Sequence, residues 1–122
     1  TRVEALYSLA KEELQRANKT SVAYYAHALA GIGLVRLQLG TNLVEAVSLT
    51  QSAISLYKRL YGAVSTNVAS MQFNLGCLYQ SSGKSQEAIK AFQKALQINR
   101  EVHGSAHTRV SAVQQELKSL GV

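Results

Sequence analysis

The chain has 122 residues, enough for one compact domain that buries about two-thirds of its unfolded surface. Thirteen Lys and Arg against seven acids give a net charge of +6, but the basic residues are spread along the whole chain, which favours a solvated surface over a stripe that follows a nucleic-acid backbone. The single cysteine excludes an internal disulfide framework, and the longest apolar run, 28–35, is far shorter than the roughly 20 residues that a membrane span needs.

The composition favours helices, because the chain has no proline and is rich in alanine, leucine and glutamine. It opens at Thr1 without a methionine or a charged-then-apolar leader, so we expect a piece of a longer protein. One unpaired cysteine fits a reducing compartment, and we therefore expect a cytoplasmic location.

Four segments follow one another along the chain, and together they predict six helices. Residues 1–19 form the first helix, called here the orphan helix because it has no partner within its own unit. Two helical hairpins follow, over 22–64 and 65–106, and a terminal helix occupies 107–122. The domain is thus predicted to be a single all-helical unit over 1–122.

Internal repetition supports the two hairpins. The stretch 32–40, IGLVRLQLG, aligns with 75–83, LGCLYQSSG, and the two start 43 residues apart. Beyond the turn the offset is 42, and it pairs Gly62 with Gly104, so one residue is inserted near Asn42. In the second hairpin an apolar stripe at helical spacing comprises Ala88, Ala91, Phe92, Ala95, Leu96 and Ile98. A period of this length predicts stacked units that cannot bury their apolar faces alone.

The triplet Gly83-Lys84-Ser85 resembles the end of a phosphate-binding loop. That loop needs its first glycine five positions before the second, where this chain has Leu78, and it must follow a buried strand. We therefore interpret the triplet as a turn between helices. Gly83 would end one helix in a left-handed conformation, Lys84 would be exposed, and Ser85 would cap the next helix.

The residues of the second hairpin resemble the tetratricopeptide repeat, with Leu75-Gly76-x-x-Tyr79, then Gly83, then Ala88-x-x-x-Phe92-x-x-Ala95. The units are longer than the usual 34 residues. Gly104, His107 and Val110 follow at a spacing that is similar to the extended 42-residue repeat of kinesin light chains. The resemblance implies an all-α fold, a right-handed superhelical stack of antiparallel helix hairpins with about six helices.

Three residues depart from the family pattern. Gln72 stands where the family usually has a large apolar residue, Arg36 replaces the tyrosine of the first hairpin, and Thr50 replaces its phenylalanine.

The resemblance also implies where a partner binds, because the first helices of such stacks line a concave face that takes extended or helical peptides. The matching positions here are His27, Ala30, Gly31, Leu34 and Gln38, then Ser70, Phe73, Asn74, Cys77 and Ser81, and Ala112, Gln115, Glu116 and Ser119 on the terminal helix. Asn74 falls on an asparagine position that bonds peptide backbone in the family. The wall is small and neutral, so we expect backbone hydrogen bonds and packing on Phe73 and Leu34. Each of these residues could instead pack against a neighbouring helix.

No constellation for catalysis or metal binding stands out. His103 and His107 are four residues apart, but Gly104 interrupts any helix there and no third ligand is near. Cys77 has no histidine or acid at helical spacing, and His27 has nothing obvious to titrate against. We expect no enzyme activity, no metal and no cofactor, and any catalytic domain would lie elsewhere in a parent chain.

Three functions remain open. The resemblance favours a non-catalytic adaptor or scaffold whose concave face binds a protein or peptide partner. The alternative is a structural domain for self-association or assembly, which uncovered Leu6, Leu9 and Leu14 on the orphan helix would favour. A third, nucleic-acid binding through the basic surface, predicts a steep loss of affinity with salt and is disfavoured by the scattered charges.

Overall fold

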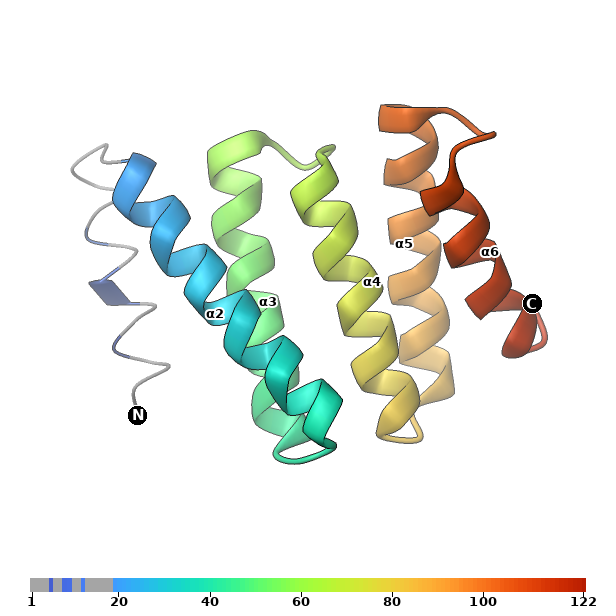
Figure 1. Ribbon diagram of the computed structural model, residues 1–122, viewed down its shortest axis with the longest axis horizontal. Coiled ribbons are helices and arrows are strands. Elements are labelled where there is room, and N and C mark those ends of the chain that lie inside the picture. Colours follow the sequence, from blue (N-terminus) through green and yellow to red (C-terminus); the bar gives the residue numbers. More distant parts are fainter. Residues whose placement is uncertain (1–4, 6–7, 10–11, 13–18) are drawn as a thin grey trace.

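The computed structural model describes residues 5, 8–9, 12 and 19–122, and in this part of the chain it forms five helices (Figure 1). They are α2 (Lys19–Leu39), α3 (Leu43–Tyr61), α4 (Thr66–Ser81), α5 (Ser85–His103) and α6 (Thr108–Ser119). The predicted orphan helix falls mostly outside the described residues. α2 includes three residues, 19–21, that precede the predicted start of the first hairpin.

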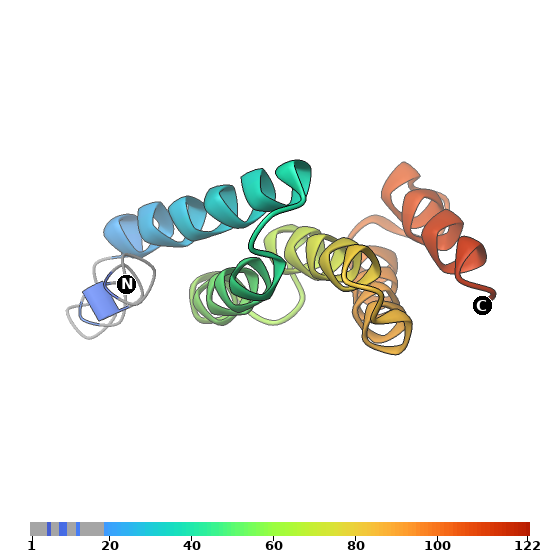
Figure 2. The ribbon, with the colours of Figure 1, turned by 90° about the horizontal axis from the view of Figure 1, so that it is seen from below.

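The helices form two layers. Each helix packs against the next one along the chain, and α2 also contacts α4. Figure 2 shows α2, α4 and α6 on one side of the molecule, with α3 and α5 on the other. The first hairpin (α2 and α3) and the second hairpin (α4 and α5) therefore contribute their first helices to one layer, which α6 continues. None of the helices in the described ranges is long and apolar enough to cross a bilayer.

The core follows the apolar stripes of these helices. One cluster is centred on α2 and α3, where Val22, Leu29 and Leu49 are fully buried. A second cluster joins α5 to α6, where Phe92 meets Val113. The buried residues of α5 and of α6 recur at helical spacing, so each helix packs one face against the core.

A glycine in the first helix of each hairpin lets its second helix approach closely. In the second hairpin, a Cβ built on Gly76 would lie 2.5 Å from Cε1 of the fully buried Phe92. In the first hairpin, a Cβ built on Gly33 would lie 2.9 Å from Oγ1 of Thr50. The two glycines are 43 residues apart and their partners 42, so both predicted offsets recur in the packing of the helices.

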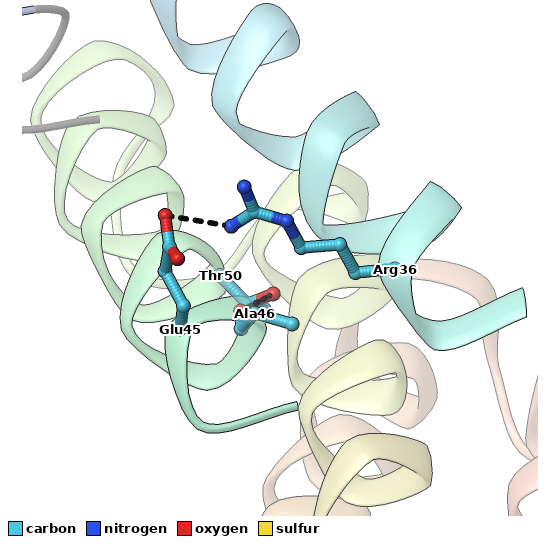
Figure 3. A network of polar contacts seen from close by, with 4 residues as sticks. All are labelled: Arg36, Glu45, Ala46 and Thr50. Carbon is cyan, nitrogen blue, oxygen red and sulfur yellow. Dashed lines mark hydrogen bonds and ion pairs between the residues drawn. The ribbon is translucent and has the colours of Figure 1, made fainter. Parts of the chain in front are cut away.

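The two substituted positions of the first hairpin make polar contacts of their own (Figure 3). The Thr50 hydroxyl donates to the carbonyl of Ala46 at 2.9 Å, which satisfies it inside the core. Arg36 Nη1 lies 2.8 Å from Glu45 Oε1, an ion pair that joins α2 to α3. In the second hairpin the position of Arg36 is taken by Tyr79, whose hydroxyl accepts a hydrogen bond from Gln51 of α3 at 3.2 Å.

The turn between α4 and α5 confirms the predicted role of Gly83 and corrects that of Ser85. Gly83 has a φ of 76°, and the N–H of Lys84 bonds to the carbonyl of Tyr79 at 2.8 Å, the long bond of a Schellman motif. Lys84 is the N-cap of α5, and its side chain makes no capping bond. The prediction of Ser85 as the cap is wrong by one residue, because the carbonyl of Lys84 already accepts the first helical bond, from Ala88 at 3.0 Å.

The turns that leave the second helices are alike in the two hairpins. Gly62 has φ 87° and ψ 166°, and Gly104 has φ 87° and ψ 162°. Only glycine adopts this region without strain. The chain therefore leaves α3 and α5 with the same backbone geometry, 42 residues apart.

Candidate functional site

Ten of the fourteen residues predicted to line the concave face lie on α2 and α4, in two groups. On α2, Ala30 is half-buried and the others are exposed, namely His27, Gly31, Leu34 and Gln38. On α4, Ser81 is exposed and the others are half-buried, namely Ser70, Phe73, Asn74 and Cys77. One cavity brings together Ser70, Phe73 and Asn74. The α2 residues do not line this cavity, and His27 and Gly31 border a separate hollow instead.

That cavity, called here the α4–α6 cavity, has a volume of about 240 Å³ and is framed by three helices. It is lined by Ala69, Ser70, Phe73 and Asn74 of α4, Asn99 of α5, and Arg109, Ala112 and Val113 of α6. The walls are mostly apolar, and four polar side chains converge on them. Its size is below that of pockets for drug-sized ligands and matches a single side chain or a short piece of backbone.

Local capping positions the α6 side of this cavity. His107 is the N-cap of α6, and its Nδ1 accepts the backbone N–H of Arg109 at 3.1 Å. Val110, Val113 and Leu117 then recur at helical spacing and are buried. The residues one position before the first two, Arg109 and Ala112, consequently line the edge of the α4–α6 cavity.

Arg109 spans the cavity from α6 to α4. Its Nη1 donates to the hydroxyl of Ser70 at 3.1 Å. No acidic side chain within the described ranges forms an ion pair with this guanidinium. Since a guanidinium carries five N–H donors, most of its hydrogen-bonding capacity is left for a ligand.

Asn99 contributes a buried polar group from the opposite layer. Its side chain is only 4% exposed, and its Oδ1 has no hydrogen-bond partner in the part of the chain that the structure describes. A buried polar atom without a partner costs about 1–3 kcal/mol, so such groups call for an explanation. Gln72 Oε1 is also buried without a partner, but Gln72 lines a different hollow, between α3, α4 and α5.

Phe73 and Cys77 belong to the core as much as to the surface. The Phe73 ring centroid lies 5.5 Å from that of Phe92. Phe73 and Cys77 both pack against the core cluster that joins α5 to α6. Burial, and then the charge of Glu116, raise the pKa of the Cys77 thiol to about 11. The thiol is therefore protonated at neutral pH and is a poor nucleophile.

The α2 group faces different surroundings. Nδ1 of His27 lies 2.5 Å from the hydroxyl of Tyr57, which ties α2 to α3. Burial, and then Tyr61, raise the pKa of Tyr57. His27 and Gly31 also border an open hollow of about 640 Å³, together with apolar side chains such as Val35 and Leu39.

His103 ends α5 and His107 caps α6, and the contact between these two side chains is called here the histidine joint. The rings of His103 and His107 stack with centroids 4.4 Å apart, and Oγ1 of Thr66 lies 3.2 Å from Nε2 of His103. Within the described ranges, no group of three His, Cys, Asp or Glu side chains is arranged to hold a metal ion. Desolvation, and then the charges of His107 and Arg109, lower the pKa of His103.

Two polar residues of the cavity, Asn99 and Arg109, were not predicted from the sequence, nor were the apolar Ala69 and Val113. Asn99 carries a signal, because it extends the stripe of Ala88, Phe92 and Ala95 by one helical turn and is polar where that stripe is apolar. Arg109 carries none, since a basic residue in the first turn of a helix is ordinarily solvated.

Comparison with protein-family models matches residues 24–101 to a model described as tetratricopeptide repeat. A search of curated proteins finds no match.

Proposed function

Because the chain belongs to the tetratricopeptide repeat family, whose repeats generally mediate protein–protein interactions, we propose that it is a non-catalytic adaptor or scaffold module that binds a partner peptide. The binding surface would be the layer formed by α2, α4 and α6 (Figure 2). The observation that carries this proposal is the α4–α6 cavity, where polar side chains from three helices converge on apolar walls.

Within this surface the α4 residues would make the central contacts. Asn74 would bond the backbone of the peptide through its amide, and Phe73 would supply an apolar wall. Ser70 holds Arg109 in place. The exposed α2 residues, His27, Gly31, Leu34 and Gln38, would extend the surface along the peptide, with Cys77 and Ser81 at the far end of α4.

The finer classification is part of the same proposal. We infer extended units over 22–64 and 65–106 like those of kinesin light chains, which Gly62 and Gly104 support through their shared backbone geometry. Stacking of such units would give a right-handed superhelix, and the protein would work in the cytoplasm.

A second candidate, self-association or assembly with further repeats, is favoured by one observation. α2 leaves several large apolar side chains uncovered, among them Tyr24 at 70%, Leu39 at 69% and Val35 at 52% exposure. Leu9 of the predicted orphan helix is also exposed, while Leu6 and Leu14 lie outside the described residues. Exposed apolar patches of this kind mark contact surfaces.

Selection from a library of random peptides tests the proposed function. Ala112→Trp places an indole in the α4–α6 cavity, because Ala112 is exposed and lines it. Ser111→Trp is the matched control, since Ser111 is the exposed neighbour that does not line the cavity. Both variants are checked for unchanged helicity by circular dichroism.

Wild type and Ser111→Trp are expected to enrich the same peptides, and Ala112→Trp to lose them. Enrichment that is unaffected by Ala112→Trp would move the binding surface away from the cavity. A wild type that enriches no peptide and sediments as an oligomer would replace the adaptor proposal with assembly.

A further inference from the structure

We infer that the α4–α6 cavity selects one acidic side chain, Asp or Glu, of the partner peptide. The inference rests on the proposed function, since it names the chemistry that this cavity recognises in its ligand. Arg109 and Asn99 would carry the selection, and neither lies at the first-helix positions from which the concave face was predicted.

The charge at the cavity favours a carboxylate. Arg109 is the only charged residue among those that line it, and the guanidinium has no carboxylate partner in the described part of the chain. Its hydrogen bond to Ser70, made at the exposed rim, places the guanidinium between α4 and α6. A carboxylate placed there would gain a charge-assisted hydrogen bond, which is roughly twice as strong as a neutral one.

Two histidines stand next to Arg109, and α5 also carries an exposed acid, Glu101, two residues from Asn99. His103 of α5 and His107 at the start of α6 lie beside it, and Thr66 of α4 contacts His103. The nearest acid identified on α6 is Glu116, which acts on Cys77, farther along the helix. An incoming carboxylate therefore meets attraction rather than repulsion at Arg109.

Asn99 supplies a second polar contact at the base of the cavity. Its Oδ1 is buried, so the amide nitrogen is the end that is left to face the cavity. An amide nitrogen donates hydrogen bonds, as the guanidinium does. Donors from α5 and α6 thus converge on one small space, and a carboxylate offers two oxygens to accept from both.

The apolar walls fit the stem of such a side chain. Ala69, Phe73, Ala112 and Val113 surround the polar groups, and the methylene groups of a Glu or Asp side chain can pack against them. A volume of about 240 Å³ admits one side chain and no more than a few waters beside it. The cavity is therefore suited to read one residue of the peptide rather than a run of acids.

The test uses one peptide selected by the wild-type chain from the random library and synthesised with an amidated C-terminus. Each Asp is replaced by Asn and each Glu by Gln, one at a time, and every peptide is titrated calorimetrically. The protein variants are Arg109→Gln and the matched control Arg100→Gln, because Arg100 is an exposed arginine of α5 that does not line the cavity.

In the wild type and in Arg100→Gln, neutralising one particular acid is expected to weaken binding about tenfold, the scale of one lost charge-assisted hydrogen bond. Arg109→Gln should bind the original peptide about tenfold more weakly, and in this variant the same replacement should change the affinity little. Asn99→Leu replaces the amide with an apolar side chain of similar size that has no donor. This variant should reduce the difference in affinity between the original peptide and its neutralised version.

Several outcomes separate the inference from the proposed function. Peptides that bind the cavity but tolerate neutralisation of every acid would overturn the inference and leave the adaptor function standing. An unchanged acid dependence in Arg109→Gln would also overturn it, as would binding that is lost in the amidated peptide and needs a free C-terminal carboxylate. A wild type that selects no peptide would instead defeat the proposed function on which the inference rests.

Discussion

The two hairpins share one backbone plan and fill it with different side chains. In the second hairpin a fully buried phenylalanine ring, Phe92, occupies the space over Gly76. In the first hairpin the nearest atom over Gly33 is the hydroxyl oxygen of the smaller Thr50. A glycine at the equivalent position lets the two helices approach closely in both hairpins. The residue that faces this glycine, Phe92 or Thr50, then decides how much apolar contact each hairpin gains.

The difference extends to the contacts that leave each hairpin. Tyr79 of the second hairpin accepts a bond from Gln51 of α3, and so joins the two hairpins to one another. Arg36, at the equivalent place in the first hairpin, pairs with Glu45 inside its own hairpin (Figure 3). Tyr79 therefore links the two hairpins, whereas Arg36 links the two helices of its own hairpin.

The largest expected effect is the loss of the phenylalanine. Phe92→Ala should lower the free energy of unfolding by about 3–5 kcal/mol, because it removes a fully buried ring and leaves a cavity. Thr50→Ala should cost only about 1 kcal/mol, since it removes one methyl group and one satisfied hydroxyl. Urea unfolding followed by circular dichroism measures both. Equal losses would show that the two hairpins do not differ in this packing.

Alanine at the glycines probes the same space from the other helix. Gly76→Ala should cost about 1–3 kcal/mol, because its Cβ would overlap the Phe92 ring. Gly33→Ala should cost less, since its Cβ meets a single hydroxyl at 2.9 Å. Gly31→Ala is the matched control on α2 and should stabilise by up to about 1 kcal/mol, because a Cβ there meets nothing within 4 Å.

The thermal midpoints of the three glycine variants should therefore rise from Gly76→Ala through Gly33→Ala to Gly31→Ala. A Gly76→Ala protein as stable as the Gly31→Ala protein would contradict the close approach of α4 and α5.

The ion pair of the first hairpin is expected to contribute little. A double-mutant cycle on Arg36→Ala and Glu45→Ala should give a coupling energy of about 0.5 kcal/mol, because the pair lies partly in water. The coupling should fall further in 0.5 M salt, where exposed pairs are screened. A coupling that is larger and insensitive to salt would mean that the pair is shielded from solvent.

The smallest expected effect is a difference in how the stability of two turns depends on pH, the turn before α4 and the turn before α6. Ser65 caps α4 through its hydroxyl, whereas His107 caps α6 through Nδ1 and stacks on the ring of His103. The pKa of His103, stacked on His107, is lowered by desolvation and by its neighbours. The unfolded chain therefore binds the proton first, so the stability contributed by neutral His103 is complete above about pH 6.5 and declines as the pH falls below it.

Amide exchange should accordingly speed up in α6 between pH 7.5 and 5.5, after correction for the intrinsic pH dependence of exchange, while α4 keeps its protection. His103→Gln should remove part of this difference. Equal changes of protection in the two helices would contradict the role of the histidine joint.

Much of the fold could be predicted because the residues that end its helices are recognisable from the local sequence. Gly83 and Gly104 lie at turns whose backbone geometry only glycine readily adopts, so their spacing already marks the helix ends. The cap of α5 was misplaced by one residue because serine is a common capping residue, yet here the helix already begins with the carbonyl of Lys84, directly after the Schellman bond.

The candidate site was harder to predict, because it depends on which helices face one another. Ser70, Phe73 and Asn74 were predicted from the family resemblance together with helical spacing, and all three line the cavity. Asn99 and Arg109 come from α5 and α6, and only the packing of three helices brings them beside Asn74. The predicted residues of α2 do not line the cavity, and partner binding by the residues of either helix remains a prediction.

Chemical-shift mapping with a selected peptide tests the central claim, that the partner binds at the α4–α6 cavity, most directly. The account predicts that the peptide perturbs the amide signals of Ser70, Asn74, Asn99 and Ala112, with the side-chain amide signal of Asn99 among the largest changes. Perturbations confined to the exposed apolar residues of α2, around Val35 and Leu39, would contradict the account.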